Sequence, residues 1–129
     1  MDKPILPQHA YLMQAMRSFI ARYPDYARCN RRRLAKAYDM ALSGYVHALG
    51  HGHYAVRSQS GNGSYRVTIY GVDEPRCECP DRARVVYCKH ILAALFASQA
   101  DTARWVDLER EIEREREQEE AQCTPLDIR

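Results

Sequence analysis

The sequence lacks the long apolar runs and the leader pattern that would direct it to a membrane or out of the cell. Its longest apolar stretch, residues 91–97, is far shorter than the roughly 20 residues that a membrane-spanning helix needs. The first four residues begin no secretory signal pattern. We therefore expect a cytoplasmic protein without a membrane partner.

Patterns typical of catalysis are also missing. The sequence has no Ser/His/Asp grouping, no glycine-rich phosphate loop and no metal motif with an open coordination position. It contains no internal repeat, and its 129 residues suffice for one compact domain with a modest core. A non-enzymatic protein without a small-molecule substrate is therefore the expected class.

The cysteine pattern argues against a secreted disulfide framework. The chain has five cysteines, an odd number, and three of them lie within residues 77–88. Such clustering is more typical of metal ligands in a reducing compartment. Cys29 and Cys123 lie in other segments, and we interpret them as free thiols rather than as a disulfide or a redox switch.

Charge is distributed unevenly along the chain. Residues 1–100 carry 14 basic and 7 acidic side chains, whereas residues 101–129 carry 5 basic and 10 acidic ones. The basic part attracts polyanions, although its excess charge is moderate. Charge alone does not establish a nucleic-acid partner, but it predicts that the two parts face different partners.

The first 50 residues are predicted to form a pair of amphipathic helices. Apolar residues recur at helical spacing between Leu12 and Tyr23, and Pro24 ends this pattern. A second helix is predicted from Asn30, as its N-cap, to Gly50. We expect the apolar stripes of the two helices to pack against each other.

From His53 the apolar period changes from helical spacing to alternation, which predicts two strands around a turn at residues 60–64. Asn62-Gly63 within that turn is a favoured hairpin dipeptide. A short helix follows at residues 91–96, and Asp101 is predicted to cap another that carries Trp105 and its apolar neighbours. We expect those neighbours, Leu108 and Ile112 among them, to dock on the domain rather than to form a coiled coil.

Four residues form a pattern typical of a structural zinc site. Cys77 and Cys79 are separated by one residue, as are Cys88 and His90, with eight residues between the two pairs. Three thiolates and one imidazole fill a tetrahedral zinc shell, which leaves no position for catalysis. The alternative interpretation, without a metal, is that these residues are buried cysteines beside a surface histidine. His47, His51 and His53 could be interpreted as a second metal site, but glycines between them make the backbone loose.

The segments Cys77-Glu78-Cys79-Pro80-Asp81 and Cys88-Lys89-His90-Ile91 resemble the SWIM-type zinc finger, whose pattern is Cys-x-Cys followed by Cys-x-His. The resemblance extends over roughly residues 34–98, with the four ligands as its specific part. It implies one structural zinc ion and a role in binding DNA or other proteins. No single activity comes with it.

Basic side chains suggest a surface that contacts phosphates, with Tyr65 or Tyr87 available for stacking on bases. Three consecutive arginines in a helix's first turn oppose the helix dipole, which suggests a use for them. The alternative is an ordinary solvated surface. The candidate nucleic-acid-binding residues are Arg31, Arg32, Arg33, Lys36, Arg57, Arg66, Arg82, Arg84 and Lys89.

Together these patterns predict a small, zinc-stabilised α+β domain. Its parts are an N-terminal helical region (1–50), a β-hairpin with the finger (51–100) and a charged C-terminal helix and tail (101–129). We expect a DNA-binding accessory or regulatory protein. The alternative function is a protein–protein adaptor that docks a nucleic-acid-processing partner, and the oligomeric state is not predicted.

Overall fold

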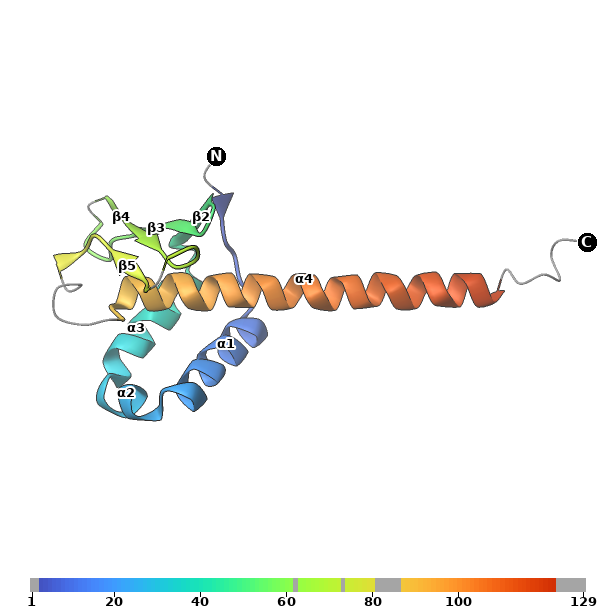
Figure 1. The fold of residues 1–129 in the computed structure, drawn as a ribbon, viewed down its shortest axis with the longest axis horizontal. Helices are drawn as coiled ribbons and strands as arrows, with labels where there is room; N and C mark the ends of the chain where they lie inside the picture. Colours follow the sequence, from blue (N-terminus) through green and yellow to red (C-terminus); the bar gives the residue numbers. More distant parts are fainter. Residues whose placement is uncertain (1–2, 62, 73, 81–86, 123–129) are drawn as a thin grey trace, which may run out of the picture.

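One long helix, α4 (Lys89–Gln122), lies between a small sheet and three shorter helices (Figure 1). The computed structural model describes residues 3–61, 63–72, 74–80 and 87–122. The shorter helices are α1 (His9–Arg22), α2 (Pro24–Cys29) and α3 (Arg31–Leu42). Both α1 and α3 pack mainly against α4 and less against each other. The predicted α+β class is therefore confirmed, but the helical stripes are buried chiefly by α4.

The sheet contains five antiparallel strands within the described residues, in sequence order. They are β1 (Lys3–Pro4), β2 (Val46–Gly50), β3 (His53–Arg57), β4 (Ser64–Thr68) and β5 (Arg76–Cys77). The predicted hairpin is confirmed as β3 and β4, with Val56 opposite Tyr65. The amide of Ser58 donates to the carbonyl of Gly63 across the turn (3.0 Å), and Asn62 lies outside the described residues.

The core surrounds the first three turns of α4, with the sheet on one side and α1 and α3 on the other. Val56 and Val67 alternate with exposed arginines along their strands, so they share the face that packs on the helix. The helix contributes Ile91, Leu92 and Phe96, each fully buried. Alternation on the strands and helical spacing on α4 thus bury one common apolar cluster.

The helix predicted to run from Asn30 to Gly50 ends instead at Leu42, which corrects the sequence analysis. Gly44 has a positive φ of 78°, its amide donates to Ala41, and the amide of Tyr45 donates to Met40. These two bonds form a Schellman motif, which satisfies the last carbonyls of α3. The residues after Gly44 then form β2, because their apolar positions fit a strand as well as a helix.

Two smaller differences concern the ends of helices. Pro24 ends α1 as predicted, but it also occupies the first turn of α2, where its missing amide proton costs nothing. Asn30 stands at the predicted N-cap position of α3 without capping it through its side chain. Its side-chain Nδ2 donates to the carbonyl of Tyr26 (2.9 Å), and its side-chain Oδ1 accepts from Arg33.

The two helices predicted near residues 91–96 and after Asp101 are one continuous helix. The intervening residues include neither glycine nor proline, so nothing interrupts α4, which crosses from residue 100 to 101 without a break. Its carboxyl half projects from the body (Figure 1). Trp105 and Ile112 remain 50% and 46% exposed, so their predicted docking on the domain is wrong, although Leu108 is half-buried.

None of the helices within the described residues combines the length and the apolar character that a membrane crossing demands.

Candidate metal centre

The sheet holds the first pair of predicted zinc ligands. Cys77 ends β5 and lies opposite Val67 of β4, and the next amide, that of Glu78, donates to the carbonyl of Arg66 (3.2 Å). The chain then turns, so that the amide of Cys79 donates to the Cys77 sulfur at 3.4 Å. Backbone hydrogen bonds therefore place both thiols beside the core.

The second pair stands at the amino-terminal end of α4, as the sequence predicts. The carbonyl of Cys88 accepts from the amide of Leu92 (3.0 Å), which makes Cys88 the residue that precedes the helix. His90 lies in the first turn, and its ring packs against that of Tyr65 with 4.6 Å between centroids. A sheet residue thus orients a ligand that belongs to the helix.

The four side chains form one buried cluster. Their ligand atoms all lie within 4.8 Å of one another, and Nδ1 of His90 is 4.0 Å from the Cys88 sulfur. In a tetrahedral zinc site, Zn–S bonds of about 2.3 Å and Zn–N bonds of about 2.0 Å place neighbouring ligand atoms about 3.5–3.8 Å apart. If the longest distances between ligand atoms shorten by about 1 Å, the cluster reaches that geometry, so the residues fit zinc.

The burial of the four side chains distinguishes a zinc site from the alternative of buried cysteines beside a surface histidine. His90 is only 5% exposed, which excludes the reading in which it is a surface histidine. All three cysteines are also buried. A buried imidazole among three sulfurs has few strong hydrogen-bond partners, whereas a metal satisfies all four groups at once.

The thiols influence one another's protonation. A hydrogen bond with Cys77 lowers the pKa of Cys88 against the opposing effect of burial, and hydrogen bonds with His90 and the Ile91 amide act in the same direction. The same contact with Cys88 raises the pKa of Cys77, and burial adds to that rise. These contacts favour the thiolate form of Cys88 at the start of α4, where the helix dipole also favours negative charge.

The other candidate metal ligands do not form a comparable group. Within the described parts of the chain, the zinc ligands are the one set of three or more His, Cys, Asp or Glu side chains close enough to hold an ion. His53 instead shares a hydrogen bond with Thr68 (2.9 Å). Cys29 is an exposed free thiol, as predicted, and Cys123 lies outside the described residues.

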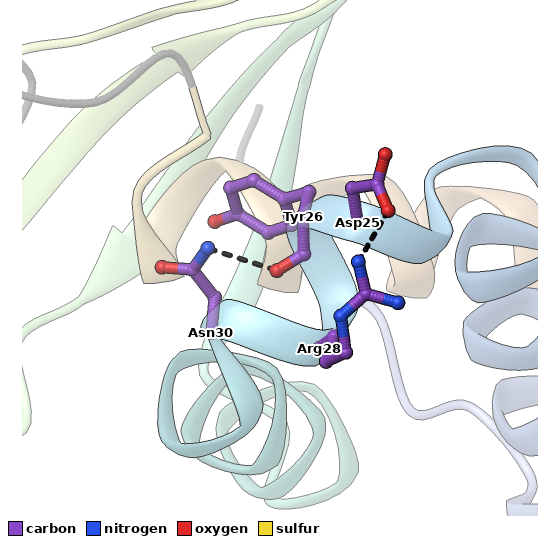
Figure 2. Close-up of polar contacts among 4 residues, drawn as sticks. All are labelled: Asp25, Tyr26, Arg28 and Asn30. Atoms are coloured by element: carbon purple, nitrogen blue, oxygen red, sulfur yellow. Dashed lines mark hydrogen bonds and ion pairs between the residues drawn. The ribbon is translucent and has the colours of Figure 1, made fainter.

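Five of the predicted phosphate-contacting residues lie around one hollow, which we call the basic hollow. It has a volume of about 410 Å³ and lies between the α2–α3 turn and the start of α4. Figure 2 shows that turn, where Arg28 pairs with Asp25 at 2.6 Å. The cationic residues of the hollow are Arg28, Arg31, Arg32, Arg33, Lys36 and Lys89.

The remaining predicted residues are not part of the hollow. Arg57 and Arg66 are exposed, and they alternate with Val56 and Val67, so they point away from the core on the outer face of the sheet. Arg57 lies over the ring of Tyr45, 5.4 Å from its centroid. Arg82 and Arg84 lie outside the described residues. The structure thus divides the predicted basic set between two surfaces.

Both tyrosines proposed for base stacking are used in packing. The ring of Tyr65 lies against His90, and Tyr87 packs among the rings of Phe19, Tyr23 and Tyr26. The contact between Tyr65 and His90 was missed in the sequence analysis. The sequence indicates this contact only through the alternation of β4, which places Tyr65 on the same face of the sheet as Val67.

A comparison with known families matches residues 65–99 to the SWIM zinc finger. This span begins in β4, contains all four ligands and ends within α4. The family match does not include residues 34–64, although the resemblance to the SWIM-type finger seen in the sequence was expected to extend over them. No curated protein and no solved structure matched the chain. The family match and the Cys₃His cluster together fit one structural zinc ion.

Proposed function

Because residues 65–99 match a SWIM-type zinc finger with a closed Cys₃His set, we propose that this protein is a non-enzymatic, DNA-binding accessory or regulatory protein. In this proposal zinc maintains the scaffold and basic side chains contact the phosphates. With all four coordination positions filled by protein, zinc has no open position at which to activate water or substrate.

The observation that carries the proposal is the basic hollow. The amino-terminal ends of α3 and α4 both contribute to it, and neither helix has an acidic residue in its first turn. The start of α3 adds a partial positive charge to the cationic side chains, whereas the start of α4 faces the Cys88 thiolate. Asp25 pairs with Arg28, and no other ion pair neutralises the hollow within the described residues. Such a surface attracts phosphate groups.

The hollow is joined directly to the zinc site. Lys89 lies in sequence between Cys88 and His90, and its ammonium group donates to Gln59 of the β3–β4 turn at 2.9 Å. Zinc bound to the two flanking residues would hold the backbone of Lys89 in place. We therefore expect phosphate binding to depend on zinc although no phosphate approaches the metal.

The proposal is tested by the salt dependence of DNA binding. A protein that makes four phosphate contacts is expected to show a slope of about −3.6 in a plot of log affinity against log salt concentration. Its affinity for DNA then falls roughly 150-fold between 50 and 200 mM salt. The zinc-loaded protein is titrated onto a fluorescent 20-base-pair duplex at both concentrations by anisotropy. The double variant Arg31→Ala/Arg32→Ala is expected to lower the steepness of the slope by about 2.

The matched control is Arg110→Ala/Arg114→Ala, which removes the same charge from an exposed part of α4. We expect it to bind DNA like wild type. Equal losses in the two variants would show that net charge, not the hollow, governs binding. Zinc-loaded protein that does not retain DNA would reject the proposal and favour the adaptor function. An apolar docking interface of an adaptor would respond only weakly to salt.

A further inference from the structure

Helices α1, α2 and α3 leave an apolar groove between them. It has a volume of about 450 Å³. Ile20 is 36% exposed, so the groove is open to solvent. Its apolar lining consists of Met16, Ile20, Pro24, Ala27, Leu34 and Ala35.

The groove continues into the basic hollow. Arg28 and Arg31 line both, so the surface changes from apolar to strongly basic over a short distance. A ligand complementary to this surface has an apolar part followed directly by an acidic part. A helix with such a sequence suits a groove of this kind, because residues three and four apart present one continuous face.

The projecting half of α4 has this composition. Trp105, Leu108 and Ile112 share one face, and Glu115 and Glu119 follow on it at seven residues from Leu108 and Ile112. Residues 109–120 include seven glutamates and three arginines, and all of them are exposed. The same face of the helix therefore changes from apolar to acidic, as the groove changes from apolar to basic.

The helix cannot reach the groove of its own chain. Phe96 is buried in the core beside Phe19 of α1 (5.8 Å between ring centroids), and farther along α4 Asp107 accepts a hydrogen bond from Tyr11 (2.8 Å). These contacts hold α4 alongside α1. At 1.5 Å per residue, residues 109–120 lie about 20–36 Å beyond Phe96. A continuous helix cannot fold back over that distance.

We propose that the groove binds the projecting half of α4 from a second copy of this chain. Trp105 and Ile112 would enter the apolar groove, and the glutamates would lie against Arg28 and Arg31. Every copy exposes both surfaces, so they meet once the concentration is high enough. Few apolar anchors take part, and we expect salt-sensitive association at roughly 10–100 μM.

This inference goes beyond the proposed function, because it requires no DNA. Sedimentation equilibrium of the zinc-loaded chain over 5–500 μM, without DNA, is expected to show association that weakens at least tenfold between 50 and 500 mM salt. Trp105→Ala/Ile112→Ala should remain monomeric while keeping its zinc and its circular dichroism. The matched control Gln118→Ala should associate like wild type. A wild type that stays monomeric throughout overturns the proposal.

Mixing experiments separate docking in the groove from simple pairing of two α4 helices. Ile20→Glu and, independently, Ala35→Glu place a carboxylate in the groove at positions that are already exposed. Each should abolish self-association, and mixing either with Trp105→Ala/Ile112→Ala should restore a heterodimer, because one chain keeps the groove and the other the helix. Self-association that persists in both groove variants, or a mixture without heterodimer, overturns the proposal.

Discussion

Removal of zinc is expected to separate β5 from the start of α4. Cys77 ends the strand, whereas Cys88 precedes the helix and His90 lies in its first turn, so the metal would tie two consecutive elements together. Each of the four ligands is at most 8% exposed. Without metal, the buried imidazole and thiols keep only weak sulfur hydrogen bonds in place of strong coordination bonds.

The expected magnitude is large compared with the stability of the domain. Structural zinc sites in small fingers contribute about 10–16 kcal/mol of apparent binding free energy near neutral pH. The free energy of unfolding of a small domain is only about 5–15 kcal/mol. Loss of zinc should therefore abolish the cooperative unfolding transition or lower the melting temperature by more than about 20 °C.

Near-ultraviolet circular dichroism provides a local probe. Tyr87 directly precedes Cys88, and its ring packs against Phe19 (5.4 Å) and Tyr23 (5.7 Å). This aromatic signal should collapse when zinc is chelated and in Cys88→Ser. The control Cys29→Ser, which changes an exposed thiol outside the ligand set, should retain one zinc per chain and the wild-type melting curve. An unchanged melting temperature after verified metal loss would refute the reasoning.

Two substitutions test the fold itself. Gly44→Ala should destabilise the domain by about 1–2 kcal/mol in urea unfolding, because φ is +78° and a Cβ would lie 2.9 Å from Leu6; Ser43→Ala, next to it, should cost less. Phe96→Ala should cost about 3–5 kcal/mol, because the ring is fully buried, whereas Trp105→Ala should cost less than about 1 kcal/mol at 50% exposure. Equal effects of the last two substitutions would contradict the burial of Phe96.

The zinc ligands could be predicted because their information is local. Ligand type and spacing alone identify the two pairs, and the position of Cys88 at a helix start follows from the apolar period after it. The hairpin was predictable for the same reason, since alternation around Val56 and Val67 specifies which face is buried.

The failures occurred where a local pattern has two readings. The apolar residues from Tyr45 to Leu49 fit a helix as well as a strand, and only the Schellman bonds at Gly44 and the pairing with β3 select the strand. Asp101 is a favourable cap residue, but neither glycine nor proline precedes it, and α4 continues through it. Residues that favour the start or the end of a helix thus had less influence on the structure than strand pairing and tertiary packing.

The basic hollow depends on long-range folding. Arg31 and Lys89 are far apart in sequence, and only the packing of α3 on α4 brings them to the same surface. The same packing leaves Arg57 and Arg66 on another face. The sequence supplies these charges as candidates, but no local pattern could sort them into two surfaces.

The uninterrupted α4 gives the molecule a lever arm. From Asp107, which accepts the hydrogen bond of Tyr11 in α1, the helix extends about 22 Å farther to Gln122. A tilt of this part by about 10° at Asp107 moves the far end by about 4 Å. Because Phe96 and Asp107 hold the helix against α1, while zinc bound to Cys88 and His90 would anchor its start, small shifts in the body of the domain are amplified at the distant end.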